Sequence, residues 1–390
     1  MADARVYLDH NATAPLRPAA RDAMIAALSM TGNPSSVHAE GRAMRAMIGR
    51  ARQAVADLCG TTPARVTFTS GATEAANLAL SPDYRMGRAA LKIAHLYVSG
   101  VEHPCVLSGG RFPADAVTVL PVDAAGRLDL DALDVALSTH DAAQGQAMLA
   151  LQLANNETGV IQPVAEAARI VHARQGLVVV DAVQGAGRMS LSLSELGADF
   201  LFVSAHKIGG PAGCGALVAS GEILMPAPLI RGGGQEKGHR GGTENSAAII
   251  GFGAAAIEAM AEAAASATLR VIRDRIEARI RALAPDVIIH GAEAERLANT
   301  IFFSLPGLKA ETSQIGFDME GIAVSAGSAC SSGKVGTSHV LAAMGADDRL
   351  GAIRVSIGHS TTDGDVDRFL AAFETINSRR LSRQPGAHAA

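Results

Sequence analysis

One lysine of this chain stands where an amine can do chemistry. Lys207 follows Ser204 and His206 directly after the apolar run 199–203, and only five lysines occur in the sequence, at positions 92, 207, 237, 309 and 334. A lysine at the carboxyl end of a buried strand is typical of the residue that forms a Schiff base with pyridoxal phosphate. Considered alone, Lys207 is better explained as a surface lysine after a buried strand. The other motifs of the chain favour the Schiff-base lysine instead.

Polar clusters also follow four other apolar runs. They occupy residues 69–73, 102–104, 155–159 and 181–184. Taken singly, they fit an N-capped helix start, a structural loop histidine and ordinary turns. Ligands of parallel α/β sheets bind beyond the carboxyl ends of the strands. Five clusters of complementary chemistry at one such edge therefore indicate a cofactor site.

The chemical needs of that cofactor assign the residues. Its pyridinium nitrogen needs a carboxylate, Asp181, to stay protonated, and its aldehyde needs an amine, Lys207, that also serves as a base. The phosphate needs hydroxyl groups and helix N–H groups, while the phenolic oxygen needs neutral donors. The candidates are Thr73, Ser204 and His206 for the phosphate, and Asn156 and Gln184 for the phenolic oxygen.

Composition argues against several classes of protein. The chain has 390 residues, 48% of them hydrophobic, with a formal net charge of -4 and a pI near 6.3. We see no basic run for nucleic acid, and expect no apolar stretch of the roughly 18 residues that a membrane helix needs. The start of the chain lacks a signal region, and the four cysteines (59, 105, 214 and 330) form no C-x-x-C pair. We therefore expect a cytoplasmic protein without disulfides or a resident metal.

Apolar runs alternate with Ala-rich helical stretches through the first half of the chain, which predicts an α/β fold with a parallel sheet covered on both faces. Its expected strands are 65–69, 96–98, 148–153, 177–180 and 199–203, and its expected helices 73–80 and 163–174. One long helix is expected over 254–283, because isoleucines at 272, 276 and 280 share a face. Strands at 287–289, 300–305 and 353–357 and a helix at 365–376 complete a smaller α+β domain.

Longer strings carry a resemblance to a known family. They are residues 7–15, 32–38, 68–75, 155–159, 181–184, 204–207, 240–245, 327–333 and 353–356. Together, in this order, they resemble the cysteine desulfurases of the class-V aminotransferase family, most closely the NifS-like members. Each string alone is short, but the set covers nearly the whole chain and is highly specific. The string 240–245 leans toward NifS, although nothing in the sequence separates nitrogen fixation from housekeeping duty.

The resemblance implies a pyridoxal-phosphate-dependent transferase of fold type I, with a mainly parallel sheet of the seven-stranded type. The large domain would span 16–255, and the small domain 1–15 with 256–390. Lys207 would hold the cofactor, His103 would stack on its ring, and Arg354 would bind the substrate carboxylate, with Asn33 a weaker candidate. The residues implied to line the cofactor site are Ala72, Thr73, Asn156, Asp181, Gln184, Ser204, Ala205 and His206. Thr243 would reach the phosphate of a neighbouring subunit, which implies a homodimer.

Cys330 decides the activity that the resemblance implies. It lies in the Gly/Ser-rich stretch 325–333, which we expect to be mobile. Its thiolate would take the sulfur of L-cysteine as a persulfide, leave alanine, and deliver the sulfur to an iron–sulfur scaffold or another acceptor, with Cys330 a possible transient cluster ligand there. A thiol of ordinary pKa is only about 3% thiolate at pH 7, so a cation or protonated histidine is expected to help, with His103 and His339 as candidates. The other cysteines fit the usual reading of a small buried hydrophobe.

Two other functions stay open. Selenocysteine lyase or another class-V reaction such as transamination would use the same cofactor site, and transamination would not need Cys330. A non-catalytic sulfur carrier or cluster-assembly partner would not need Lys207. Two departures from the family also stand out: Cys105, where alanine is commoner, and Ala212, where lysine or glutamine is often found. We interpret Cys105 as a packing variant.

Overall fold

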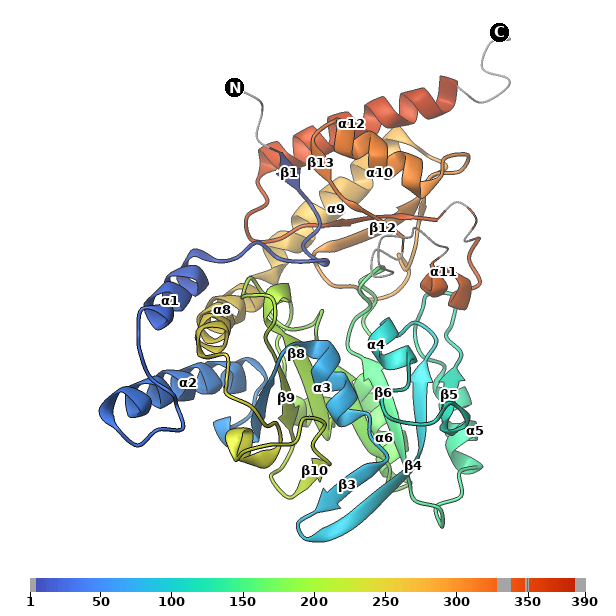
Figure 1. Ribbon diagram of the computed structural model, residues 1–390. Coiled ribbons are helices and arrows are strands. Elements are labelled where there is room, and N and C mark those ends of the chain that lie inside the picture. The colour runs from blue at the N-terminus through green and yellow to red at the C-terminus, as the bar shows by residue number, and fades with distance from the viewer. Residues whose placement is uncertain (1–4, 328–337, 348, 350, 383–390) are drawn as a thin grey trace.

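The computed structural model describes residues 5–327, 338–347, 349 and 351–382. These residues form a large lower unit and a smaller upper unit, with the first strand and the last helix both in the upper one (Figure 1). The predicted nucleophile Cys330 lies outside the described residues.

The large unit is built on a sheet that has nine strands within the described residues. Seven of them run in the order β2–β9–β8–β7–β6–β4–β5, and β9 is the member that pairs antiparallel with its neighbours. The bounds are β2 Val66–Thr69, β4 Ala89–Ser99, β5 Val117–Leu120, β6 Gln146–Gln152, β7 Leu177–Asp181, β8 Phe200–Ser204 and β9 Gly215–Ala219. The mainly parallel sheet predicted from the sequence is therefore confirmed.

A hairpin extends this sheet beyond the prediction. Strand β3 (Asp83–Met86) pairs antiparallel with the first half of β4, and β10 (Leu224–Pro226) pairs with β3. Strand β4 is therefore far longer than the predicted 96–98. Its first half serves the hairpin, and its second half serves the central sheet.

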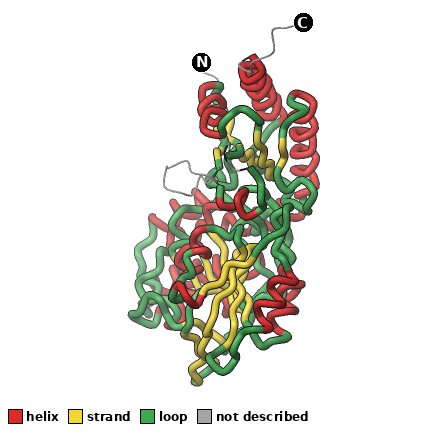
Figure 2. Tube along the Cα trace, turned by 90° about the vertical axis from the view of Figure 1, so that its right-hand side faces the viewer, coloured by secondary structure: helices red, strands yellow, loops and turns green. Residues whose placement is uncertain are grey.

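Apolar side chains of the central strands alternate between two hydrophobic cores. Val178 and Val180 of β7 enter one core, while Leu177 and Val179 enter the other. Helices cover both faces, as Figure 2 shows by the helices on either side of the sheet. Their bounds are α1 Pro18–Leu28, α2 Ala39–Leu58, α3 Ala72–Ala79, α4 Pro104–Leu107, α5 Leu130–Ser138, α6 Val164–His172, α7 Leu193–Leu196 and α8 Ser246–Ala264. Burial on both faces explains why the strands read as continuous apolar runs.

The small unit has its own core and its own strands. An antiparallel sheet runs in the order β11–β12–β15–β14, and β1 pairs in parallel with β13. The strands are β1 Val6–Tyr7, β11 Ile288–Ile289, β12 Thr300–Ser304, β13 Ile322–Ala323, β14 Ser325–Ala326 and β15 Ile353–Ser356. The helices are α9 Ser266–Leu283, α10 Ala310–Met319, α11 His339–Ala343 and α12 Asp363–Ser382. The start of the chain thus completes a unit made mostly from its last third.

The single long helix expected over 254–283 is wrong. The structure has two helices, α8 and α9, separated at Ala265, whose φ of -98° and ψ of 12° depart from helical values. The apolar face of α8 packs in the large core through Ala259, whereas Ile276 and Ile280 of α9 pack in the small one. The helical pattern continues across the break because both segments favour helix, but their apolar residues serve different cores. We therefore propose that the two units divide at Ala265 and not at residue 256.

Helix α8 also corrects the expectation about membrane helices. Within the described residues it is the one helix long and apolar enough, by length and composition, to cross a membrane. More than half of its apolar window is buried, and it packs against α1 and α2. Burial in a protein core explains this composition equally well.

Candidate active site

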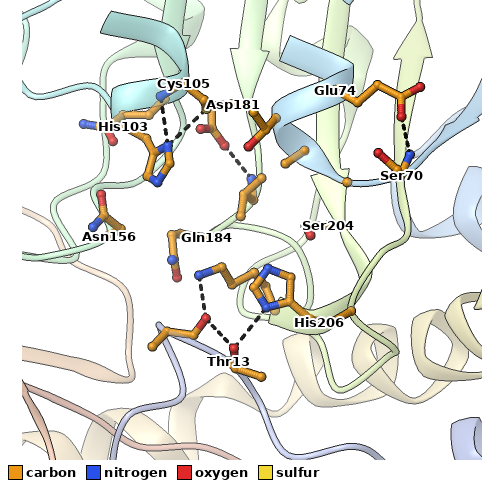
Figure 3. A pocket seen from close by; sticks show the side chains of 18 of the residues that line it. Thr13, Ser70, Glu74, His103, Cys105, Asn156, Asp181, Gln184, Ser204 and His206 are labelled. Carbon is orange, nitrogen blue, oxygen red and sulfur yellow. Dashed lines mark hydrogen bonds between the residues drawn. The ribbon is translucent and has the colours of Figure 1, made fainter. Parts of the chain in front are cut away.

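A cavity of about 590 Å³ opens where the strands of the large sheet end and the small unit begins. Figure 3 shows its polar side chains converging from separate elements. Ten of the predicted site residues line it: Ala72, Thr73, His103, Asn156, Asp181, Gln184, Ser204, His206, Lys207 and Arg354. Because parallel strands end at one edge, residues far apart in sequence meet there.

Lys207 ends a short 3₁₀ turn, Ala205–Lys207, that directly follows β8. Its Nζ donates hydrogen bonds to the backbone oxygens of Asn11 at 2.6 Å and Ala12 at 2.8 Å. Both carbonyls belong to the segment that leaves β1, so the start of the chain holds the amine in place. This contact could not be predicted, because no local pattern links residue 12 to residue 207.

Asp181 is the last residue of β7 and is buried. Its Oδ1 accepts the backbone N–H of Val183 at 2.9 Å. Burial raises the pKa of its carboxyl group to about 6, although the Val183 hydrogen bond and the Lys207 charge oppose that shift. A buried carboxylate in a cavity calls for a cationic or N–H partner, which is what a protonated ring nitrogen provides.

His103 caps the short helix α4 and carries no charge near neutral pH. Its Nδ1 accepts the backbone N–H of Cys105 at 3.2 Å, and the Cys105 Sγ lies 3.0 Å from the same nitrogen. Burial, with the Lys207 and His339 charges, lowers the pKa of His103 to about 4. A neutral ring that accepts at Nδ1 carries its proton on Nε2. The flat uncharged ring suits stacking on another flat ring.

His206 is also neutral. Burial lowers its pKa to about 4, with the Lys207 and Arg188 charges contributing. Its Nδ1 lies 3.1 Å from the hydroxyl oxygen of Thr13, a residue of the N-terminal segment. His206 and Thr13 thus join the large unit to that segment beside Lys207.

Gln184 is oriented by an arginine that the sequence did not single out. Arg188 donates to the Gln184 Oε1 at 2.7 Å and to its backbone oxygen at 2.9 Å. The Gln184 amide nitrogen then donates to the backbone oxygen of Asn11 at 3.1 Å. Burial lowers the pKa of Arg188 to about 10. Arg188 follows Gln184 by one helical turn, and that spacing is the signal that could have found it.

The start of α3 forms one wall of the cavity. Backbone N–H groups at a helix N-terminus favour an anion, and Ser70, Gly71 and Thr73 line the cavity there. A β-carbon on Gly215 of the neighbouring β9 would lie 2.6 Å from the Gly71 backbone, so only glycine allows this close approach. Ser204 and His206 border the same region.

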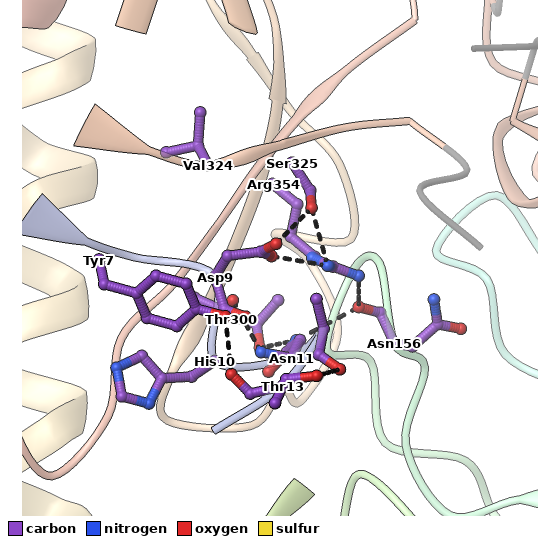
Figure 4. A network of polar contacts seen from close by, with 12 residues as sticks. Tyr7, Asp9, His10, Asn11, Thr13, Asn156, Thr300, Val324, Ser325 and Arg354 are labelled. Carbon is purple, nitrogen blue, oxygen red and sulfur yellow. Dashed lines mark hydrogen bonds and ion pairs between the residues drawn. The ribbon is translucent and has the colours of Figure 1, made fainter. Parts of the chain in front are cut away.

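Arg354 enters the cavity from β15 of the small unit. It is among the largest fully buried side chains of the described residues. Its Nη1 donates to the backbone oxygen of Asn156 at 3.0 Å, and its Nη2 pairs with the Asp9 Oδ1 at 2.8 Å (Figure 4). A buried guanidinium that lines the same cavity as Lys207 is suited to a substrate carboxylate.

Residues next to the undescribed stretch are tied to the large unit. Ser338 donates to the Glu157 carboxylate at 2.6 Å and also caps α11 through the backbone N–H of Leu341. His339 Nε2 lies 2.9 Å from the backbone oxygen of Glu102. Burial raises the pKa of Glu102, the residue before His103, well above its usual range.

Three predicted residues lie outside this cavity. Ala205 is buried beneath it, and Asn33 is exposed in the loop before α2. Thr243 lines a separate cavity of about 190 Å³ with Glu244 and Arg240. The structure thus brings neither Asn33 nor Thr243 to Lys207 within one chain.

The cavity also contains residues that the sequence did not assign. They are Ala12, Thr13, Ser70, Gly71, Glu74, Cys105, Gln152, Ala154, Val183, Ala212 and Gly213. Many of them lie within a residue or two of a predicted site residue, so strand ends already pointed at them. Cys105, interpreted from the sequence as a packing variant, borders the cavity beside His103.

The donor set of this cavity fits pyridoxal phosphate. The cofactor needs an amine, a buried carboxylate, a flat neutral ring, neutral amide donors and an anion-binding helix start. Lys207, Asp181, His103, Gln184 and the start of α3 supply these in turn. Asp181 is the most telling of them, because a buried carboxylate next to a cavity is costly without a partner.

The chain has extensive similarity to characterised proteins. Residues 6–369 match the family model described as Aminotransferase class-V. An IscS-like cysteine desulfurase of Mycobacterium tuberculosis is 38% identical over 381 residues, which is 95% of each chain. A cysteine desulfurase of Cereibacter sphaeroides is 40% identical over 389 residues, which is 98% of each chain. The solved structure of a NifS-like protein from Rickettsia africae aligns with a TM-score of 0.86 at 32% identity, covering 96% of this chain and 99% of that one.

Proposed function

The chain belongs to the class-V aminotransferase family and is a cysteine desulfurase, and from this premise we propose how its residues divide the work. The enzyme converts L-cysteine to L-alanine and supplies sulfur for iron–sulfur cluster assembly. The resemblance found in the sequence is confirmed by relatives that match nearly the whole chain. The assignment of roles depends above all on the meeting of Lys207, Asp181 and His103 in one cavity.

Pyridoxal phosphate, when bound, supplies an electron-withdrawing ring that weakens the bonds at the substrate's α- and β-carbons. We propose that Lys207 binds it covalently and then moves the proton at the substrate α-carbon. Asp181 keeps the ring nitrogen protonated from the buried end of β7. Ala72, Thr73, Ser204 and His206 hold the phosphate, with Ala205 supporting that wall from beneath.

Neutral groups orient the ring and exclude water. His103 offers an uncharged ring whose Nε2 carries a proton, because Cys105 donates to Nδ1. The Gln184 and Asn156 side chains provide amide donors for the phenolic oxygen, and Arg188 keeps Gln184 from rotating. Arg354 binds the substrate carboxylate, with Asn33 as the weaker candidate. Together these contacts fix which substrate bonds face Lys207.

Cys330 is proposed as the sulfur acceptor, although it lies outside the described residues. Its thiolate attacks the substrate sulfur, so that a sulfur–sulfur bond forms as the carbon–sulfur bond breaks. The electron pair of the broken bond stays with the three-carbon fragment, which is protonated and leaves as alanine. The resulting persulfide is the form handed to an iron–sulfur scaffold or another acceptor protein.

A homodimer is proposed as the working form, in the cytoplasm. Thr243 lines a cavity next to the one that holds Lys207 and does not line the latter within its own chain, which is consistent with service to a partner's phosphate. Large apolar side chains are exposed on the large unit, on α1 and at residues 229–230. They are Ile25, Leu28, Leu229 and Ile230, and a partner that covered them would remove apolar surface from water.

Mass spectrometry tests the sulfur acceptor directly. The purified enzyme is incubated with L-cysteine, its persulfides are trapped by alkylation, and peptides are searched for one added sulfur atom. We expect that atom on Cys330, and alanine rather than pyruvate in solution. Cys330→Ser should lose at least about 100-fold in sulfide release, because its nucleophile is gone.

Cys214→Ser is the matched control, since that thiol is buried and burial raises its pKa to about 12. It should keep wild-type alanine formation. A Cys330→Ser enzyme that released sulfide at the wild-type rate would refute the assignment of the acceptor. Equal alanine yields without any persulfide would refute the sulfur-transfer route itself.

A further inference from the structure

The guanidinium of Arg354 is occupied before any substrate arrives. Its side chain is 2% exposed, and Nη2 donates both to the Asp9 Oδ1 at 2.8 Å and to the Ser325 Oγ at 3.1 Å. Nη1 donates to the backbone oxygen of Asn156. Nε is buried and has no acceptor among the described residues. The group is therefore neutralised by Asp9 but not fully hydrogen-bonded.

Backbone pairing places Asp9 beside this arginine. Asp9 forms a parallel bridge with Ser356, two residues after Arg354, and Ser325 on β14 lies directly opposite Arg354 on β15. The Ser325 hydroxyl donates to the other Asp9 oxygen, Oδ2, at 2.8 Å. The Asp9 carboxylate is thus held by groups on two neighbouring strands, β14 and β15, and Figure 4 shows it pointing at the guanidinium.

Because of the geometry of a guanidinium, the Asp9 carboxylate competes with a substrate carboxylate for Arg354. A carboxylate binds arginine best through two parallel N–H groups on one edge. One edge uses Nε with Nη2 and the other uses Nη1 with Nη2, so both edges share Nη2. A substrate carboxylate that takes either edge must displace Asp9 or Ser325 from Nη2. The vacant Nε donor marks the edge, shared with Nη2, at which a carboxylate can gain a hydrogen bond that the resting site lacks.

Resting on the function proposed above, we propose that Asp9 is a placeholder counter-ion for Arg354, displaced by the α-carboxylate of the amino-acid substrate. A buried guanidinium without an anion is strongly unfavourable, so the empty site needs Asp9. The incoming carboxylate replaces one anion with another. The substrate therefore binds less tightly than it would to an Arg354 without a counter-ion. Amines that lack a carboxylate do not compete with Asp9 and so gain nothing from the neutralised arginine.

Asp9→Asn separates this role from a merely structural one. Asparagine keeps the shape and a hydrogen-bond acceptor but removes the competing charge. We expect the holoenzyme variant to bind the product L-alanine about tenfold more tightly than the wild type, since a charge-assisted contact no longer has to be broken. Its melting temperature without L-alanine should fall, because Arg354 is left unneutralised. Calorimetric titration and thermal unfolding measure the two effects, and the apoprotein should show the same fall.

Asp286→Asn is the matched control. Asp286 pairs with both Nη atoms of buried Arg380 at 2.6 and 2.7 Å in the same small unit, far in sequence from the cavity residues. It should lower the melting temperature but leave L-alanine affinity unchanged. Ethylamine, which lacks a carboxylate, should bind wild type and Asp9→Asn equally.

Arg354→Gln shows whether a negative result refutes the placeholder role of Asp9 or the substrate-binding role of Arg354. If Arg354→Gln as a single substitution does not weaken L-alanine binding, the proposed substrate role of Arg354 is wrong. If it does weaken binding while Asp9→Asn leaves L-alanine affinity unchanged or lower, the placeholder is wrong and the proposed function stands. In the double variant the gain from Asp9→Asn should vanish, and a gain that persisted would also overturn the placeholder.

Discussion

The two walls of the cavity are held together in different ways. On the large-unit side, Asp181 ends the buried strand β7, Lys207 lies in the turn after β8, and hydrogen bonds to backbone groups fix their positions. On the small-unit side, Asp9, Ser325 and Arg354 hold one another through their side chains. The first wall is set by sheet geometry and cannot relax without unfolding. The second is set by charge pairing and can exchange partners, as binding of a charged substrate demands.

The walls meet through the segment after β1. Asn11 and Ala12 offer their carbonyls to the Lys207 amine, and the Asn11 side chain donates to the Thr300 hydroxyl at 2.9 Å. This segment belongs by its strand pairing to the small unit, yet its carbonyls contact the lysine of the large one. The contrast between the walls therefore predicts that changes on the rigid side affect chemistry most.

Lys207→Ala should have the largest effect and would test the rigid wall at its centre. Loss of both the covalent tether and the base is expected to lower kcat by at least about 10³-fold. Two measurements check this: alanine formation from L-cysteine and the visible absorption of the purified protein. Lys237→Ala, at an exposed lysine of the same unit, should change neither. A coloured, active Lys207→Ala protein would contradict the assignment.

Asp181→Asn should have opposite effects on stability and function. The pKa of Asp181 in the folded protein, about 6, lies above its ordinary value of 3.8, so the folded state binds more protons between those values. Stability of the cofactor-free protein is then expected to fall as pH rises from about 4 to about 6, by about 3 kcal/mol in total. The variant should be the more stable apoprotein at pH 7 and lose that advantage near pH 4.

Thermal unfolding of both apoproteins across this pH range checks the sign. Cofactor binding and alanine formation should both be weaker in the variant, because the ring nitrogen has lost its anion. An Asp181→Asn apoprotein less stable than the wild type at pH 7 would show that another group compensates the buried charge.

Ser338→Ala should have the smallest effect and tests a second contact between the two units, that of Ser338 with Glu157. It removes the donor to buried Glu157 and the cap of α11, at an expected cost of about 2 kcal/mol of unfolding free energy. Ser192→Ala removes an exposed cap of α7 and should cost about 1 kcal/mol or less. Equal losses in the two variants would mean that the Glu157 contact adds nothing.

Sequence reasoning succeeded where one strand end determines one residue. Asp181, Ser204 and Lys207 were found because each directly follows an apolar run, and parallel strands end at a common edge. Asp9 and the Asn11 carbonyl were missed because their partners lie hundreds of residues away. Their pairing depends on which strand lies beside which, and that information is absent from any local pattern.

The same limit explains the errors in the fold. Apolar periodicity cannot show that the two halves of 254–283 face different cores, so the break at Ala265 was missed. The hairpin strand β3 reads as polar because its side chains are mostly exposed. Thr243 and Asn33 were carried over from the family, do not line the cavity of Lys207 within one chain, and stay predictions, with Thr243 assigned to the site of a partner subunit.

The pairing of β1 with β13 has a consequence for the order in which the protein folds during its synthesis. Val6 finds its partner, Ile322, only after more than three hundred further residues have been made. At a translation speed of about 5–20 residues per second, the ribosome needs roughly 15 to 60 s to supply that partner. The nascent large unit can therefore collapse around its sheet before the small-unit strands that hold the segment of Asn11 and the substrate-binding candidate Arg354 have been made. Completion of the catalytic centre is among the last events of biogenesis.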